Sequence, residues 1–119
     1  MMRRKLVKKE NVKGGEGTAL FDYLLEDKQL QGMCGMYAKV TLPPGSSIGY
    51  HTHEGDSESY YILSGQGTYI NNNKEEMEIF PNDVTFTADG EGHSIINTGT
   101  EKLVFIAMII NSEKKETAE

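Results

Sequence analysis

The sequence predicts an all-β domain, built as a sandwich or a small barrel of short strands. Runs rich in Val, Ile, Tyr, Phe and Thr recur from Thr18 onward between turn signals, and no long window keeps the apolar period of a helix. The chain has 119 residues, of which 37% are hydrophobic and 13 are glycine, so it holds enough apolar material for one core and many turns. This composition excludes disorder over the whole chain, and the length disfavours two independent domains.

The N-terminal segment predicts an exposed arm or an edge strand. Residues 1–16 carry five Lys or Arg between Arg3 and Lys9, and a glycine-rich turn follows. We expect these charges to be solvated. The β domain should then span residues 17–111, and the charged residues 112–119 should form a frayed tail.

The strands of the domain are expected between turns with their own chemistry. Pro43, Pro44 and Gly45 should end one strand, because proline lacks an amide hydrogen and glycine accepts positive φ. Asn71, Asn72 and Asn73 should form a tight turn in the same way. We expect strands near residues 18–25, 33–42, 48–53, 58–63, 66–71, 75–80, 84–87, 93–98 and 102–111.

Charge and cysteine content narrow the class of protein. Twelve basic and eighteen acidic residues give a net charge of -6, which disfavours binding to nucleic acid. The single cysteine, Cys34, excludes an intrachain disulfide and fits a reducing compartment. The longest apolar run, residues 103–110, is too short to span a membrane, and the basic N-terminus lacks the apolar run of a signal peptide. We expect a soluble cytoplasmic protein without membrane partners.

The three histidines are the most informative residues. His51 and His53 are separated by one residue, which in a strand places both rings on one face about 7 Å apart. Glu58 follows on the next expected strand, and His93 opens a later one. Three imidazoles and a carboxylate suit one divalent transition metal ion and do not suit calcium or magnesium.

The spacing around the first two histidines resembles the first motif of the cupin family. Gly45, five residues, His51-x-His53, four residues, Glu58, six residues and Gly65 match that motif without departure in spacing. The resemblance implies a jelly-roll β-barrel that holds a metal ion, here manganese, iron, nickel or zinc, on His51, His53, Glu58 and His93. Among cupins, the chain is most similar to small single-domain proteins of the oxalate-decarboxylase-like group.

Residues 82–97 resemble the second cupin motif. Gly90, His93 and Asn97 are in register, while Asn82 stands where the motif has glycine and Ala88 where it has proline. Asparagine still tolerates a left-handed turn and alanine removes only turn rigidity, so neither departure removes a ligand. We expect Asn97 to fix a turn or loop rather than to touch a substrate.

Strand parity predicts which side chains face the barrel interior. If Glu58 points inward, Tyr60 and Ile62 do so as well, and His93 likewise turns Ile95 inward. On the strand 33–42 the inward set should be Met36, Ala38, Val40 and Leu42, as core packing or, alternatively, as pocket lining. Cys34 shares that parity and is interpreted as a small buried side chain.

Two functions fit such a site. A metal with open positions would act as a Lewis acid on a small anionic metabolite, supporting decarboxylation, isomerisation or oxygenation. All three histidines would be occupied as ligands, which leaves Glu54, Asp56, Tyr60 or bound water as the candidates for proton transfer. The alternative is a non-catalytic module that binds a small carboxylate or a sugar-like ligand through the metal. A purely structural metal is disfavoured, because such sites are usually tetrahedral and rich in cysteine.

The last expected strand predicts a homodimer. Residues 103–110 are apolar on both faces, and one barrel covers only the inward face. The arm contains few aliphatic residues that would cover the outward face. A twofold dimer would cover it, with each arm adding to the edge of the partner's sheet.

Overall fold

The chain forms two antiparallel β-sheets with very little helix. The structure is a computed structural model and describes residues 5–116. Within that range, none of the helices is long and apolar enough to cross a lipid bilayer. The elements are β1 (Leu6–Glu10), η1 (Val12–Gly14), β2 (Thr18–Tyr23), α1 (Asp27–Leu30), β3 (Cys34–Leu42), β4 (Ser47–Thr52), β5 (Asp56–Ser64), β6 (Gly67–Ile70), β7 (Glu76–Ile79), β8 (Val84–Thr87), β9 (Gly92–Ile96) and β10 (Leu103–Asn111).

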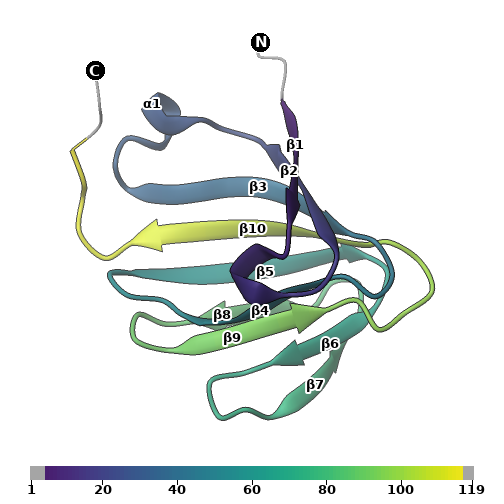
Figure 1. Cartoon of the computed structure of the whole chain (residues 1–119). Coiled ribbons are helices and arrows are strands. Elements are labelled where there is room, and N and C mark those ends of the chain that lie inside the picture. The colour runs from purple at the N-terminus through teal and green to yellow at the C-terminus, as the bar shows by residue number, and fades with distance from the viewer. Residues whose placement is uncertain (1–4, 117–119) are drawn as a thin grey trace.

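The two sheets face each other as the layers of a jelly roll (Figure 1). The larger sheet has the order β1-β2-β3-β10-β5-β8, and the smaller has the order β4-β9-β6-β7. The first three strands belong to the larger sheet. From β3 onward the chain passes repeatedly between the sheets, and only β6 and β7 are consecutive strands of the same sheet. The predicted jelly-roll barrel is confirmed, and each expected strand overlaps an observed one.

The core lies between the two sheets and follows the predicted strand parity. Ala38, Val40 and Leu42 of β3 are fully buried, and Leu103, Phe105 and Ala107 alternate inward along β10. Tyr60, Ile62 and Ile95 are buried, as predicted. This alternation is the period of two that a strand imposes on a sheet with one covered face.

The start of β3 is less covered than predicted. Met36 and Cys34 are only partly buried, which corrects the prediction that Cys34 is a buried side chain. The register of β10 against β3 shifts between Ile109 and Ile110, so that Ile110 pairs with Cys34. This irregularity ends the regular packing at that end of the strand.

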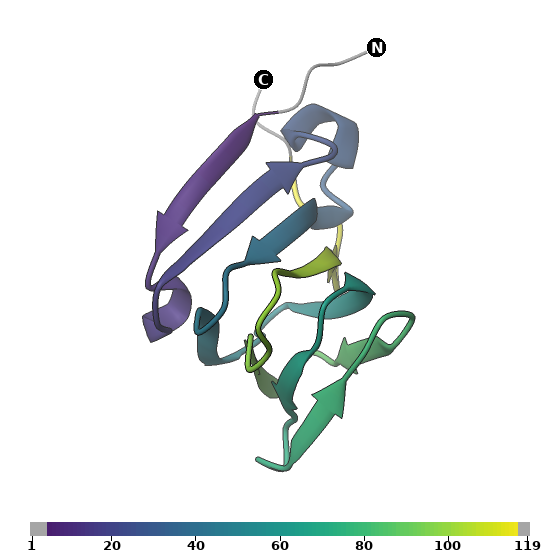
Figure 2. The ribbon, with the colours of Figure 1, turned by 90° about the vertical axis from the view of Figure 1, so that its right-hand side faces the viewer.

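The N-terminal arm extends the larger sheet of its own chain. Strand β1 pairs with β2 in antiparallel register, from Leu6 opposite Asp22 to Glu10 opposite Thr18. Figure 2 shows β1 (purple) at the edge of the sheet beside β2, with the η1 turn connecting them. The sequence predicted that each arm would add to the edge of the partner's sheet. The arm instead forms the edge strand of the sheet in its own chain.

The second motif keeps its left-handed turn despite the missing glycine. Asn82 adopts φ 77°, its amide donates to Ile62 O at 2.8 Å, and its side-chain oxygen accepts from Tyr61 OH at 3.1 Å. Asparagine tolerates this region better than most residues do.

The loop between β9 and β10 is held by Asn97, whose Nδ2 donates to the carbonyls of Leu42 and Glu101 at 2.8 Å each.

Candidate metal centre

Both sheets contribute to one cluster of histidines and a carboxylate. His51 lies on β4 directly opposite His93 on β9, and His53 follows the end of β4. Glu58 lies on β5 of the other sheet. The i, i+2 spacing puts His51 and His53 on one face, and the packing of the sheets brings Glu58 toward them.

The four side chains converge on one point. His93 Nε2 lies 3.1 Å from His53 Nε2 and 3.2 Å from His51 Nε2. Glu58 Oε1 lies 3.1 Å from His53 Nε2 and 3.0 Å from His93 Nε2. All four candidate ligand atoms lie within 4.8 Å of one another.

These separations fit a metal ion. Two donors that bind one ion at about 2.1 Å and at right angles lie about 3.0 Å apart, close to the four distances observed. The mixed nitrogen and oxygen donor set also suits a transition metal. The group can therefore hold one ion, and four ligands leave about two positions of an octahedral sphere for a small ligand.

Two of the imidazoles are oriented by acceptors close in sequence. His51 Nδ1 lies 2.7 Å from Gly49 O, and His53 Nδ1 lies 2.7 Å from Asp56 Oδ1. A neutral ring that donates its Nδ1 proton to such an oxygen presents the lone pair of Nε2 to the cluster. These partners select the tautomer that a metal requires.

His93 is oriented by two hydroxyl groups from other strands. Its Nδ1 lies 2.8 Å from Tyr69 OH on β6 and 2.8 Å from Thr87 Oγ1 on β8. The two hydroxyl oxygens are 2.6 Å apart. Tyr60 stacks on the ring with centroids 5.1 Å apart, and His93 is fully buried. The ring is thus held on its edge and on its face.

The electrostatics of the cluster favour a carboxylate beside the imidazoles. Burial alone would raise the pKa of Glu58, but hydrogen bonds with His53 and His93 outweigh burial and lower it to about 2. Burial lowers the pKa of His51, whereas the hydrogen bond with Glu58 raises that of His53. Burial raises the pKa of Tyr60 well above its ordinary value, so its phenol stays protonated at neutral pH.

Comparison with known proteins assigns the family. Residues 38–109 match the Cupin domain family. The chain belongs to the cupin family. It is 45% identical over 100 residues to the oxalate-binding protein of Thermotoga maritima, with 84% of this chain and 82% of that protein covered.

Solved structures support the assignment of this cupin. A predicted oxalate decarboxylase from Thermotoga maritima superposes with a TM-score of 0.88 at 40% identity, covering 92% of this cupin and 94% of that chain. The polyketide cyclase RemF of Streptomyces resistomycificus gives a TM-score of 0.73 at 18% identity, covering 100% and 85%. The second likeness shows a shared fold.

A cavity of about 400 Å³ opens beside the cluster and is lined by His51, His53 and Glu58. Apolar side chains form much of its wall: Val12, Phe21, Met36, Val40, Ile48, Ala107 and Ile109. The inward residues of β3 thus divide between the predicted alternatives, since Met36 and Val40 line the cavity and Leu42 does not. A larger cavity of about 570 Å³ beside α1 contains none of the four cluster residues.

The three candidates for proton transfer have different surroundings. Glu54 is exposed and lines the cavity of this cupin. Asp56 also lines it, but its carboxylate is engaged by His53. Tyr60 is buried in the cavity wall. Of the three, Glu54 is the one with a carboxylate open to a ligand.

Sequence reasoning missed several residues around the cluster. Tyr69 and Thr87 hold His93 from strands that the sequence does not place beside it. Lys9 and Lys13 of the arm line the cavity beside the cluster, although the charges of the arm were expected to be merely solvated. The basic composition of the arm was the one available signal, and composition does not say which surface an arm reaches.

Proposed function

We propose that this cupin binds one divalent transition metal ion through His51, His53, Glu58 and His93, and uses it to bind a small carboxylate of the oxalate type. The observation that carries the proposal is the convergence of these four donors at the wall of a cavity of about 400 Å³. The oxalate-binding relative from Thermotoga maritima supports the choice of ligand class. Manganese, iron, nickel and zinc all suit the donor set.

The metal would supply Lewis acidity and a point of attachment for a ligand carboxylate. The chain's own residues supply the rest. Asp56 and the carbonyl of Gly49 hold His53 and His51 in orientation, while the apolar wall limits water and strengthens electrostatic interactions inside the cavity. Glu58 offsets part of the charge of the ion.

A second candidate function is cleavage of the carbon–carbon bond of the bound dicarboxylate. Loss of carbon dioxide from oxalate leaves a one-carbon anion that must take up a proton to become formate. Glu54 lines the cavity and, within residues 5–116, its carboxylate makes no hydrogen bond or ion pair. This placement suits it to deliver that proton.

The test is metal analysis followed by titration with oxalate. Protein purified without added metal should contain one transition metal ion per chain or take one up, and the loaded protein should bind oxalate stoichiometrically. His93→Ala should abolish both, whereas the control Ser59→Ala on the outer face of β5 should change neither. Oxalate binding that is equal in the metal-free and loaded proteins would contradict the proposal. Formation of formate, lost in Glu54→Gln while oxalate still binds, would establish the second function.

We also propose a cytoplasmic homodimer that needs neither nucleic acid nor a membrane. The outward residues of β10, β5 and β8 form two rows across the strands, Met108–Ser59–Phe86 and Ile106–Tyr61–Val84, in which Ser59 and the Tyr61 hydroxyl are the only polar groups. Val84 and Phe86 are 66% and 62% exposed. A second copy of this face would cover the rows.

A further inference from the structure

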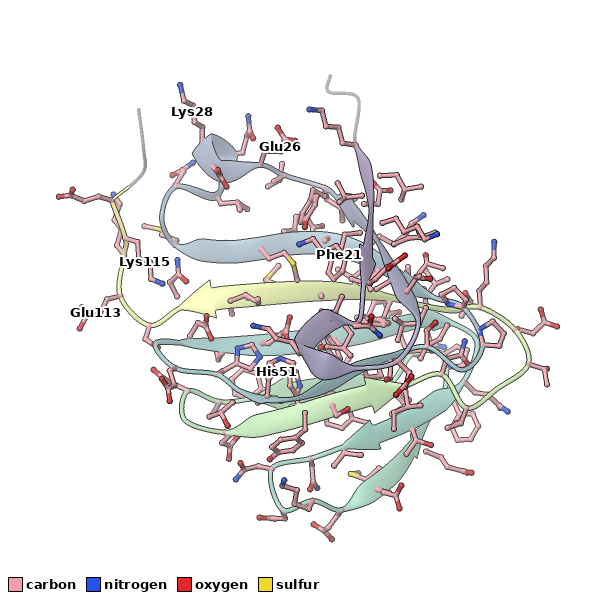
Figure 3. All side chains as sticks on the ribbon, viewed as in Figure 1. Phe21, Glu26, Lys28, His51, Glu113 and Lys115 are labelled. Carbon is pink, nitrogen blue, oxygen red and sulfur yellow. The ribbon has the colours of Figure 1, made fainter. Side chains whose placement is uncertain are left out.

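Two lysines of the N-terminal arm line the metal cavity. Lys9 belongs to strand β1 and Lys13 to the η1 turn, and both contribute to the cavity wall. Figure 3 shows His51 beside this purple turn, and Phe21, which also lines the cavity, on the strand next to β1. The arm therefore contributes cationic side chains to the wall of the cavity. The clustered histidines and Glu58 lie more than thirty-five residues later in the sequence.

Aromatic rings position Lys9 without neutralising it. Its Nζ lies 4.9 Å from the ring centroid of Phe21 and 5.8 Å from that of Tyr23. The two rings stack with centroids 6.0 Å apart. A ring face attracts an ammonium group but leaves its charge available. Within residues 5–116, Lys9 forms no ion pair with a carboxylate.

Lys13 is held at the cavity by close packing of the η1 turn on β4. A Cβ atom at Gly49 would lie 2.1 Å from Lys13 O, and one at Gly15 would lie 2.3 Å from Ser47 O. The approach thus requires glycine at both positions. Glu16 N donates to Ser47 Oγ at 2.8 Å, and Ser47 N donates to Glu16 O at 2.9 Å. These contacts hold the turn against β4 at Ser47 and Gly49, four and two residues before His51.

The two lysines reverse the sign of the net charge around the cavity. A divalent ion together with the three carboxylates that line the cavity, Glu54, Asp56 and Glu58, leaves one net negative charge. The ammonium groups of Lys9 and Lys13 change this to one net positive charge. Without them, a second carboxylate on a ligand would enter a negative surrounding.

We propose that Lys9 and Lys13 determine specificity at this site, selecting small dicarboxylates over monocarboxylates by facing the ligand oxygens that the metal does not bind. The inference rests on the proposed function and narrows it to dianionic ligands. It also gives the basic arm a function at the site rather than at the surface alone.

The experiment measures ligand binding and metal binding in matched charge variants. Lys9→Met, Lys13→Met and their double variant are compared with Lys8→Met, which loses the same charge from β1 but does not line the cavity. Metal affinity is measured by chelator competition, and the loaded proteins are titrated with oxalate, malonate and acetate by calorimetry. We expect metal affinity within twofold of wild type in all variants.

Oxalate and malonate affinity should fall about threefold to tenfold in each single cavity variant, and further in the double variant, because each loses one charge-assisted contact. Acetate affinity should change by less than about twofold, and Lys8→Met should behave as wild type. The loss should shrink at high salt. Lys9→Arg and Lys13→Arg should keep most of the affinity.

The inference fails if the double variant binds oxalate as tightly as Lys8→Met, or if acetate affinity falls in parallel with oxalate affinity. The proposed function would stand in both cases, because the loaded wild-type protein would still bind the dicarboxylate. Loaded wild-type protein that binds neither oxalate nor malonate would instead contradict the proposed function itself, and with it this inference.

Discussion

Removing the two hydroxyl groups that hold His93 should weaken metal binding in a strongly non-additive way. Tyr69 OH and Thr87 Oγ1 each lie 2.8 Å from His93 Nδ1. One Nδ1 proton needs only one acceptor. Tyr69→Phe and Thr87→Val should therefore each leave the imidazole with a partner, and each single change should lower metal affinity by no more than about threefold.

The double variant leaves the Nδ1 proton of His93 without an acceptor. Because His93 is 0% exposed, water does not replace the lost partner, and an unsatisfied buried donor costs about 1–3 kcal/mol. The ring can then turn or adopt the other tautomer, in which Nε2 carries the proton and no longer binds an ion. We expect metal affinity to fall about 50-fold to 100-fold, against about ninefold if two threefold effects were additive, which corresponds to a coupling of about 1–1.4 kcal/mol between the two residues.

The assay is a double-mutant cycle of metal dissociation constants from chelator competition at one pH, with near-UV circular dichroism to verify folding. Thr87→Ser keeps the hydroxyl and serves as the matched control, with affinity near that of wild type. Additive effects of the two changes, or a double variant that binds metal as wild type does, would refute the reasoning that either hydroxyl suffices to orient the ring.

Three further predictions concern the ligands, the arm and the outer face. His51→Ala and His93→Ala should each lose most bound metal, because each removes a donor; unchanged metal content in both would show that the ion binds elsewhere. Gly49→Ala should destabilise the protein by about 1–3 kcal/mol in urea unfolding, because its Cβ would meet Lys13 O at 2.1 Å, and an unchanged midpoint would show that the turn moves freely. Sedimentation should give twice the chain mass of 13.2 kDa, and Phe86→Glu should yield monomers; a wild-type monomer at micromolar concentration would exclude the dimer.

Local sequence patterns were sufficient to predict the strands and the four clustered side chains. The period of two along β3 and β10 identifies the buried faces, because successive side chains of a strand point to opposite sides. The His51-x-His53 spacing works in the same way, since it depends only on the geometry of one strand. The positions of Glu58 and His93 in the two cupin motifs then identified the candidate metal ligands that lie on other strands.

Contacts between strands distant in sequence were decided only by the tertiary structure. Tyr69 and Thr87 meet His93 because β6 pairs with β9 while β8 packs from the other sheet, and no local period encodes that meeting. The position of Lys13 likewise depends on two glycines, Gly15 just after η1 and Gly49 in β4, that let the η1 turn approach β4. Strand order, strand register and glycines at points where one segment packs closely on another bring such residues together. These are properties of the folded chain rather than of any one segment of it.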